Sequence, residues 1–261
     1  NSSIYCFDTK SLFDNIEKIN TQNVQKEYYL TDIIGTLIKN GKKVSCSKTL
    51  EYQEVMGVND RLQLSEVENI MQRKINESLM ENGVTIRDPG SCYIESSVVI
   101  DKDVTIEPSC FIKGKTRIGK NSSIGPFCQI ADADIGKCTV VNASVILGSV
   151  IGNNNNIGPY SYIRPGTVTG SNVKIGASSV TVNYDGLKGS KTIIEDDVSI
   201  GSDTMLIAPV KIGKGAIIAA GSVIYQDVPS NPMAIERGKK KNIKDSAVRY
   251  GDRKKLKNTK L

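Results

Sequence analysis

Aliphatic residues recur every six positions from residue 84 onward. One unbroken run in a single phase comprises Ile94, Ile100, Ile106, Ile112, Ile118, Ile124 and Ile130. After shifts in phase, further runs comprise Ile135, Val141 and Leu147, then Ile151, Ile157 and Ile163, then Ile194, Ile200, Leu206, Ile212, Ile218 and Ile224. A period of six fits neither a helix nor a lone strand, but it is typical of a parallel β-helix whose coils have three short faces. The pattern predicts about eight coils over residues 84–226, stacked about 4.8 Å apart.

Glycine follows the aliphatic residue repeatedly, and we expect it to permit the turn at each corner of a coil. These glycines are Gly119, Gly125, Gly136, Gly152, Gly158, Gly176, Gly201 and Gly213. Three cysteines, Cys92, Cys110 and Cys128, each precede an inward isoleucine by two positions. They should therefore stack in one interior column as small apolar filler. Their spacing would permit a disulfide, but a cytoplasmic setting and the lack of a CxxC motif argue against a bridge or a metal site.

Residues 1–83 have a different pattern. Helical spacing predicts helices over residues 11–19 and 28–44, the second stopped at Gly41. Short strands are predicted at residues 3–8 and 44–49, so this region reads as mixed α/β. A loose apolar stripe predicts one long helix over residues 60–82, serving as a rigid linker and capped by Gly83 in the left-handed conformation. We expect four parts: residues 1–58, a linker helix at 59–83, the β-helix at 84–228 and a tail at 229–261.

Composition narrows the chemistry. The 261 residues include no histidine, which excludes any mechanism that needs an imidazole as base, nucleophile partner or metal ligand. The net charge of +6 is unevenly spread, because residues 237–261 hold 11 basic and two acidic side chains, leaving −3 for the rest. Such a tail is either a solvated segment or a site for nucleic acid, a membrane surface or phosphorylated ligands, and we expect no membrane partner. We expect no nucleic-acid partner, because Tyr250 is its only aromatic residue. No apolar run approaches the roughly 20 residues that span a membrane, and we expect no signal peptide and a cytoplasmic protein.

The repeat resembles the hexapeptide acyltransferases. The segments GVNDRLQLSEVE, NGVTIRDP, IGPYSYIRPGT, TVNYDG, IGSDTMLIAPVKIGKGAIIAAGSV and NVQKEYYLTDII resemble, within that group, the bifunctional N-acetylglucosamine-1-phosphate uridyltransferase/glucosamine-1-phosphate acetyltransferase family. This resemblance implies a left-handed β-helix, a homotrimer, and an acetyltransferase arm that uses acetyl-CoA and glucosamine-1-phosphate in UDP-N-acetylglucosamine biosynthesis. Residues 1–58 would then be the end of a uridyltransferase domain.

Two departures from the family pattern change these expectations. The chain begins late in the uridyltransferase domain, so the nucleotide-binding loop and the metal-binding Asp have no counterpart here. Asn59 matches an Asn that helps hold Mg²⁺, but one neutral oxygen does not hold that ion, and Asn59 reads better as the N-cap of the linker helix. The second departure lies after Gly176, where about 36 residues, or two coils, are missing before Ala177. In the family that stretch carries the catalytic histidine, a tyrosine and a sugar-binding lysine.

The remaining site residues are transferred from the family one at a time. Arg164 matches a sugar-phosphate-binding Arg, and Asn183 and Tyr184 match residues lining the sugar and the acetyl group. Asn1 matches an Asn that contacts the UDP-sugar. Lys188 or Lys191 would meet phosphates, and Ser202, Ala220 and Arg237 match acetyl-CoA contacts. Several of these residues also have a plainer explanation. Arg164 could be a solvated side chain beside a turn, and Asn183 and Tyr184 belong to NYDG, a sequence that favours turns. Lys188 and Lys191 could be ordinary loop lysines, and Ala220 could be a small residue required at a corner.

No catalytic residue is assigned, because Asp185 and Glu195, the candidate replacement bases, have no motif support. Three functions stay open on the sequence. The chain is an acetyltransferase impaired by loss of its base, a trimeric scaffold that binds CoA without chemistry, or an acyltransferase with another acceptor.

Overall fold

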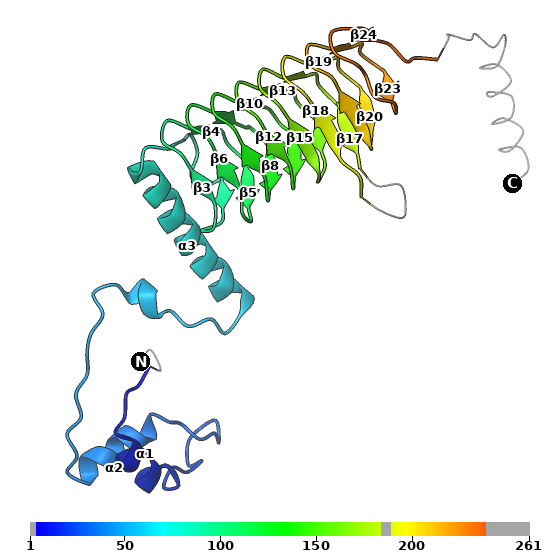
Figure 1. The fold of residues 1–261 in the computed structure, drawn as a ribbon. Helices are drawn as coiled ribbons and strands as arrows, with labels where there is room; N and C mark the ends of the chain where they lie inside the picture. Colours follow the sequence, from blue (N-terminus) through cyan, green and yellow to red (C-terminus); the bar gives the residue numbers. More distant parts are fainter. Residues whose placement is uncertain (1–3, 184–188, 239–261) are drawn as a thin grey trace, which may run out of the picture. The chain divides into compact units, whose positions relative to one another are not determined.

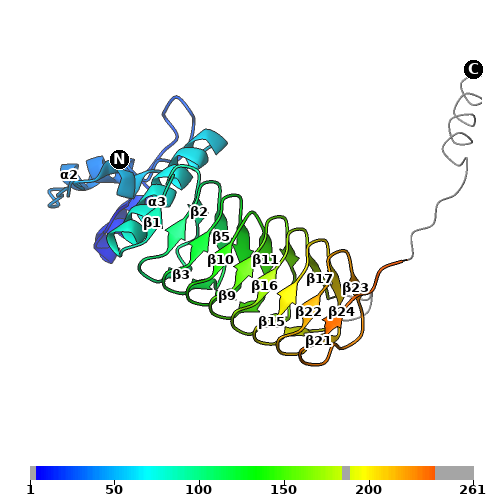
Figure 2. The ribbon, with the colours of Figure 1, turned by 90° about the horizontal axis from the view of Figure 1, so that it is seen from above.

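The computed structural model describes residues 4–183 and 189–238. The chain divides into two compact units, residues 1–71 and 72–261, with the division inside the longest helix. The first unit contains α1 (Thr9–Ile16), α2 (Asp32–Lys39), a short 3₁₀ helix (Tyr52–Val55) and the start of α3 (Arg61–Glu81). The second contains the rest of α3 and all 24 strands of the described residues. Figures 1 and 2 show these strands stacked as a triangular solenoid.

Three parallel sheets form the sides of the solenoid. Sheet A has nine strands: β1 (Thr85–Ile86), β4 (Thr105–Ile106), β7 (Ser123–Ile124), β10 (Val140–Val141), β13 (Asn156–Ile157), β16 (Lys174–Ile175), β19 (Ser199–Ile200), β22 (Ile217–Ile218) and β24 (Met233–Ala234). Sheet B has eight: β2 (Tyr93–Ile94), β5 (Phe111–Lys113), β8 (Gln129–Ala131), β11 (Val145–Leu147), β14 (Tyr162–Ile163), β17 (Val180–Val182), β20 (Met205–Ile207) and β23 (Val223–Ile224). Sheet C has seven: β3 (Val99–Ile100), β6 (Arg117–Ile118), β9 (Asp134–Ile135), β12 (Val150–Ile151), β15 (Thr167–Thr169), β18 (Thr192–Ile194) and β21 (Val210–Ile212). The predicted left-handed parallel β-helix of about eight coils is confirmed.

The inward positions follow the predicted hexads with one error. Ile146 is fully buried, whereas the predicted Leu147 is only partly buried. The reason is that the middle coils are shorter: Val145 pairs with Gln129, sixteen residues earlier, while Phe111 pairs with Tyr93, eighteen earlier. A coil shortened at its corners moves the inward position by a residue, because alternate residues of a strand point to opposite faces.

The glycines that follow the hexad aliphatics have a different role from the one predicted. Of the eight, only Gly125 has a positive φ, at 107°. The others are required by stacking, because a Cβ on Gly119 would lie 2.8 Å from the backbone carbon of Gly136 in the next coil. The left-handed corner positions belong instead to Asn, Asp and other residues, among them Asn121 at 61°.

The cysteine column is confirmed. Cys92, Cys110 and Cys128 are all buried and unbridged. The thiol of Cys92 lies 3.4 Å from the carbonyl of Glu107, and the thiol of Cys128 lies 3.5 Å from that of Val141. The hydrogen bond with Cys128, together with burial, raises the pKa of the Cys110 thiol. Buried serines and threonines continue the column in later coils: Ser144, Ser161, Ser179, Thr204 and Ser222.

The first unit has the predicted helices but not the predicted strands. Both helices are shorter than expected, and α2 ends at Gly41 with φ 73° and a bond from Lys42 N–H to Leu37 O, as a left-handed cap requires. Residues 4–8 and 44–49 form no strand. A strand needs a neighbour for its backbone N–H and C=O groups, and the described residues of this unit supply none.

Helix α3 closes the first coil of the solenoid. Only its last three turns pack on the core, through Ile75, Leu79 and Met80, while Leu62 and Met71 of the predicted stripe are exposed. Gly83 ends the helix with φ 93° and a bond from Val84 N–H to Leu79 O, as predicted. No helix in the described ranges is long and apolar enough to cross a membrane.

Candidate active site

Three predicted residues come together at the corner between sheets B and C. Arg164 follows β14 and Asn183 follows β17, and these strands are neighbours with Tyr162 opposite Val180. The Asn183 amide Nδ2 donates to Pro165 O over 2.8 Å. Lys191 lies close to Gly166, two residues after Arg164. Its Cγ is 3.7 Å from the point that a Cβ on Gly166 would occupy.

The backbone of Arg164 is held from both neighbouring coils. Its N–H donates to Thr181 Oγ1 over 2.8 Å. Its carbonyl accepts from Ser149 Oγ at 2.9 Å and from Thr167 Oγ1 at 2.8 Å. Three hydroxyls therefore set the position of the Arg164 Cα before any ligand arrives.

Three polar side-chain atoms at this corner are buried without partners. They are Nε of Arg164, a donor, Oδ1 of Asn183, an acceptor, and Oγ1 of Thr192 at the start of β18. Buried polar groups in proteins nearly always have hydrogen-bond partners, and one left unmade costs about 1–3 kcal/mol. A ligand that brings both an acceptor and a donor would satisfy the atoms of Arg164 and Asn183.

The residues predicted to contact acetyl-CoA lie in register at another corner, between sheets A and B. Ser202 follows β19 and Ala220 follows β22, and the N–H of Gly221 donates to Ser202 O over 2.8 Å. Arg237 adjoins them, because its Cδ lies 3.8 Å from the point that a Cβ on Gly221 would occupy. One chain therefore presents the two groups of residues on different edges of its solenoid. Asn1, Tyr184 and Lys188 lie outside the described residues.

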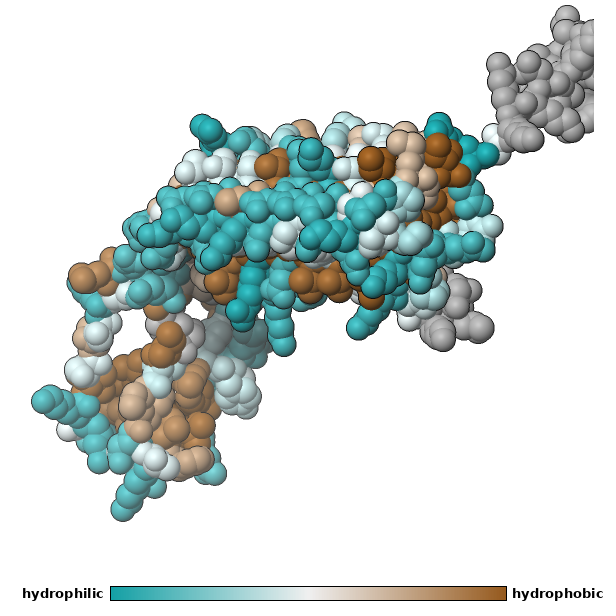
Figure 3. Space-filling model, turned by 45° about the horizontal axis from the view of Figure 1, so that its top comes forward, coloured by the Kyte–Doolittle hydropathy of each residue, from teal (hydrophilic) through white to brown (hydrophobic). Residues whose placement is uncertain are grey.

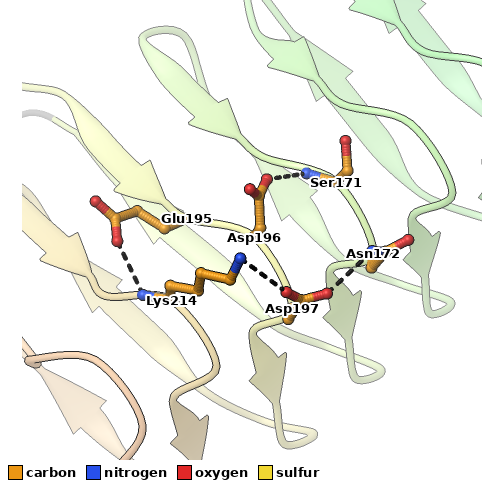
Figure 4. A network of polar contacts seen from close by, with 6 residues as sticks. All are labelled: Ser171, Asn172, Glu195, Asp196, Asp197 and Lys214. Atoms are coloured by element: carbon orange, nitrogen blue, oxygen red, sulfur yellow. Dashed lines mark hydrogen bonds and ion pairs between the residues drawn. The ribbon is translucent and has the colours of Figure 1, made fainter.

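Glu195 is poorly suited to act as a replacement base. Its carboxylate accepts from the N–H of Lys214 at 2.9 Å and pairs with the ammonium of Lys211 at 2.6 Å. These contacts lower the pKa of Glu195, the Lys211 bond most strongly. Figure 4 shows it in a corner network that also joins Lys214 to Asp197 and Asp196 to Ser171. Its role there is structural, and Asp185 lies outside the described residues.

The expected N-cap at Asn59 is wrong by one residue. Asp60 caps α3, because its Oδ1 accepts from the N–H of Gln63 at 2.8 Å. Asn59 is exposed and contributes only its backbone N–H, which donates to Gln63 Oε1. A carboxylate is at least as good a cap as an amide, and here it stands directly before the first helical residue. Among residues 4–183 and 189–238, no cluster of Cys, Asp or Glu could hold a metal ion.

Tyr162 belongs to the site but was not predicted. The guanidinium carbon of Arg164 lies over its ring, 5.4 Å from the ring centroid. Strand alternation could have found it, because residues two apart on one strand share a face. The hydroxyls of Ser149, Thr167 and Thr181 had no such signal, since they come from three other strands or corners.

Comparison with known proteins agrees with this architecture. The family model described as GMPPB C-terminal domain matches residues 94–193, and that for bacterial transferase hexapeptide (six repeats) matches residues 191–226. The bifunctional protein GlmU of Clostridium perfringens is 43% identical over 98% of this chain and 63% of its own length. That of Carboxydothermus hydrogenoformans is 39% identical over 94% and 63%. A crystal structure of Francisella novicida UDP-N-acetylglucosamine acyltransferase aligns with TM-score 0.46 and 20% identity, covering 58% of this chain and 67% of that one.

These alignments contain more positions than the chain residues that they use. The C. hydrogenoformans alignment has 279 positions but uses 94% of 261 residues, about 245, so about 34 positions have no counterpart here. The C. perfringens alignment, with 291 positions and 98% of the chain, gives about 35. Two coils at the eighteen-residue spacing of Tyr93 and Phe111 would account for this length. Sheet A remains continuous beyond Gly176, because β16 pairs directly with β19.

The chain spans slightly less than two thirds of the length of these GlmU relatives. Its solenoid, its hexapeptide match and its identity to the GlmU proteins along nearly the whole chain all agree. The chain is similar to the bifunctional GlmU proteins along nearly its whole length, and its residues 191–226 match the bacterial transferase hexapeptide model.

Proposed function

We propose that this chain is an acetyl-CoA-dependent N-acetyltransferase arm acting on glucosamine-1-phosphate in UDP-N-acetylglucosamine biosynthesis, with transfer slowed by the absence of a general-base histidine. The observation that carries the proposal is the pair of buried, unpartnered atoms on neighbouring coils, Arg164 Nε and Asn183 Oδ1. An amino-sugar phosphate supplies both matching groups: phosphate oxygens accept, and the amine or a hydroxyl donates.

Charge at this corner favours the phosphate end of such a substrate beside Arg164. A guanidinium binds phosphate through two parallel hydrogen bonds, and such charge-assisted bonds are about twice as strong as neutral ones. Lys191 adds a second cation on the same turn. Asn183, whose Nδ2 is held by Pro165 O, then directs its Oδ1 toward the sugar.

Acetyl transfer requires the sugar amine to attack the thioester carbonyl and to lose a proton as the amide bond forms and the CoA thiolate leaves. General-base assistance contributes typically 10²- to 10⁴-fold. The chain has no histidine, and the Glu195 carboxylate is engaged by Lys211 and Lys214. Positioning of the two substrates contributes independently of a base, so we expect slow transfer, with the proton passing to solvent.

Acetyl-CoA would bind along Ser202 and Ala220, with Arg237 near its phosphates. Because one chain presents these residues and Arg164 at different corners, a complete site needs the corner of another copy, and the proposal includes a homotrimer. Apolar side chains gather along the solenoid in Figure 3, and they offer a surface for such packing. Among the described residues, no cluster of Cys, Asp or Glu could hold Mg²⁺ together with Asn59, so the proposal includes no uridylyl transfer and no metal.

The alternative is a trimeric scaffold that binds CoA without catalysis. The absence of any histidine favours it.

The test is release of CoA from acetyl-CoA in the presence of glucosamine-1-phosphate, with both products separated by chromatography. Chromatography is preferable to a thiol reagent because Cys6, Cys46 and Cys138 are exposed. The variants are Arg164→Ala and, as a matched control, Arg117→Ala, which removes an exposed arginine from the outer face of β6 in sheet C.

Turnover above the blank that is lost in Arg164→Ala and kept in Arg117→Ala refutes the scaffold. CoA binding with no turnover at any enzyme concentration refutes the enzyme. A monomer in sedimentation contradicts both, because each needs the groove between copies.

A further inference from the structure

Arg164 is a cation on an apolar stretch of sheet B. It directly follows β14, whose register places Ile163 beside Ile146 of β11 and Tyr162 beside Val180 of β17. The neighbouring outward row holds Val145, Tyr162 and Val180, with Tyr162 directly opposite the two valines in turn. Arg164 is partly buried among them, with its Nε fully enclosed and unpartnered.

A guanidinium in such surroundings needs a compensating group, because a buried charge without a partner is strongly unfavourable. None of the salt bridges among the described residues involves Arg164, and its guanidinium carbon Cζ lies over the ring of Tyr162, 5.4 Å from the ring centroid. The negative face of the ring attracts the cation, which fixes one side of the guanidinium and leaves its edge for an anion.

The hydrogen bonds that hold the Arg164 backbone do not orient its guanidinium. The three hydroxyl contacts from Ser149, Thr167 and Thr181 hold only the peptide atoms of Arg164. The side chain has four further rotatable bonds, and freezing a long side chain costs up to about 2 kcal/mol. The Tyr162 ring is therefore the contact that reduces this cost before the ligand binds.

We infer that Tyr162 is a positioning residue for anion binding: its ring holds the Arg164 guanidinium with its edge toward the phosphate of the substrate. The inference rests on the proposed function for the identity of that phosphate, but the ring contact itself can be tested without it. Tyr162 acts through its ring face, so Phe should replace it and an aliphatic residue of similar size should not.

The first measurement is the Nε–H resonance of Arg164 in protein labelled with ¹⁵N-arginine, assigned by its loss in Arg164→Lys. A proton held near a ring face is shifted upfield by the ring current. We expect the shift to persist in Tyr162→Phe and to disappear in Tyr162→Leu. An Nε–H shift unchanged in Tyr162→Leu overturns the inference, whatever the chain binds.

The second measurement is the affinity for glucosamine-1-phosphate by calorimetry. Cation–π contacts are worth about 0.5–2 kcal/mol, so we expect Tyr162→Leu to weaken binding by about 2- to 30-fold and Tyr162→Phe to restore it. The matched control is Tyr93→Leu, which removes an exposed tyrosine from β2 on the same face of the same sheet. KM should rise in Tyr162→Leu more than kcat falls, because the ring acts on binding.

The outcomes separate the two proposals. Binding that is lost in Arg164→Ala but unchanged in Tyr162→Leu overturns the positioning role and leaves the proposed function standing. No binding by the unaltered chain overturns the proposed function, while the ring-current shift still decides the contact. Equal losses in Tyr162→Leu, Tyr162→Phe and Tyr93→Leu indicate a general effect on folding and overturn the inference.

Discussion

Asn76 closes the open edge of the solenoid, and its replacement by alanine should be unusually costly. The first strand of sheet B, β2, has no strand before it, so its outward-facing carbonyls need other donors. The fully buried Asn76 amide donates to Pro89 O at 2.8 Å and to Cys92 O at 3.0 Å. Gln72 donates to Ile94 O at 3.2 Å and to Asn76 Oδ1 at 3.1 Å.

The expected loss follows from these bonds. Asn76→Ala leaves two carbonyls without donors, and each unmet group costs about 1–3 kcal/mol. The higher helix propensity of alanine returns about 0.5 kcal/mol. We therefore expect a net loss of about 1.5–5.5 kcal/mol and, at about 2–4 °C for each kcal/mol in a domain of this size, a Tm lower by about 3–22 °C.

The assay is thermal unfolding followed by circular dichroism in the β region, with urea unfolding as a second measure. Asn82→Ala is the matched control, because Asn82 is exposed and its amide bonds only Ser78 O. We expect Asn82→Ala to remain within about 0.5 kcal/mol of the unaltered chain. A Tm for Asn76→Ala within 1–2 °C of that control would refute the edge-closing role.

Three further predictions test the corners and the core. Gly119→Ala should destabilise the fold by about 1–3 kcal/mol or more, because its Cβ would press on the backbone of the next coil. In Gly35→Ala, in α2, the added Cβ meets nothing within 4 Å, so this variant should be more stable by up to about 1 kcal/mol. Urea unfolding of both variants measures the two effects. Glu195 has a lowered pKa, so its contacts stabilise the fold at neutral pH and lose that effect as pH falls through its folded pKa. Melting curves should therefore separate Glu195→Gln from the unaltered chain at pH 7 and converge as the pH is lowered until Glu195 is protonated in the folded chain. A thiol reagent should modify the exposed Cys6, Cys46 and Cys138 quickly and the buried cysteines only on unfolding. The reason is that burial and a raised pKa suppress the thiolate of Cys110. Equal modification rates for all six cysteines would contradict the buried column.

The solenoid was predictable because its determinants are local and repeated. Each inward isoleucine marks one side of one coil, and the six-residue spacing survives wherever coils keep the same length. The error at Leu147 arose where coils shorten, since the sequence does not mark which corner loses a residue. The predicted strands of residues 4–8 and 44–49 failed for the opposite reason: a strand depends on a partner, and a local pattern contains no information about one.

The candidate site was predictable only as a set of residue types. Motif resemblance singled out Arg164, Asn183 and Lys191, and strand pairing brings them to one corner. The resemblance could not find Tyr162 as the ring under Arg164, because the contact depends on a side-chain conformation. Nor could it show that Glu195 is engaged by Lys211, sixteen residues away in the neighbouring coil.

The sequence by itself determined the coil and the absence of an imidazole. Both are properties of order or composition, and neither depends on how side chains meet. Only the tertiary structure decided why the corner glycines are required, which carbonyls Asn76 satisfies, and that Arg164 Nε and Asn183 Oδ1 are buried without partners. These depend on the close approach of one coil to the next, where a few tenths of an ångström separate a hydrogen bond from an unmet polar group.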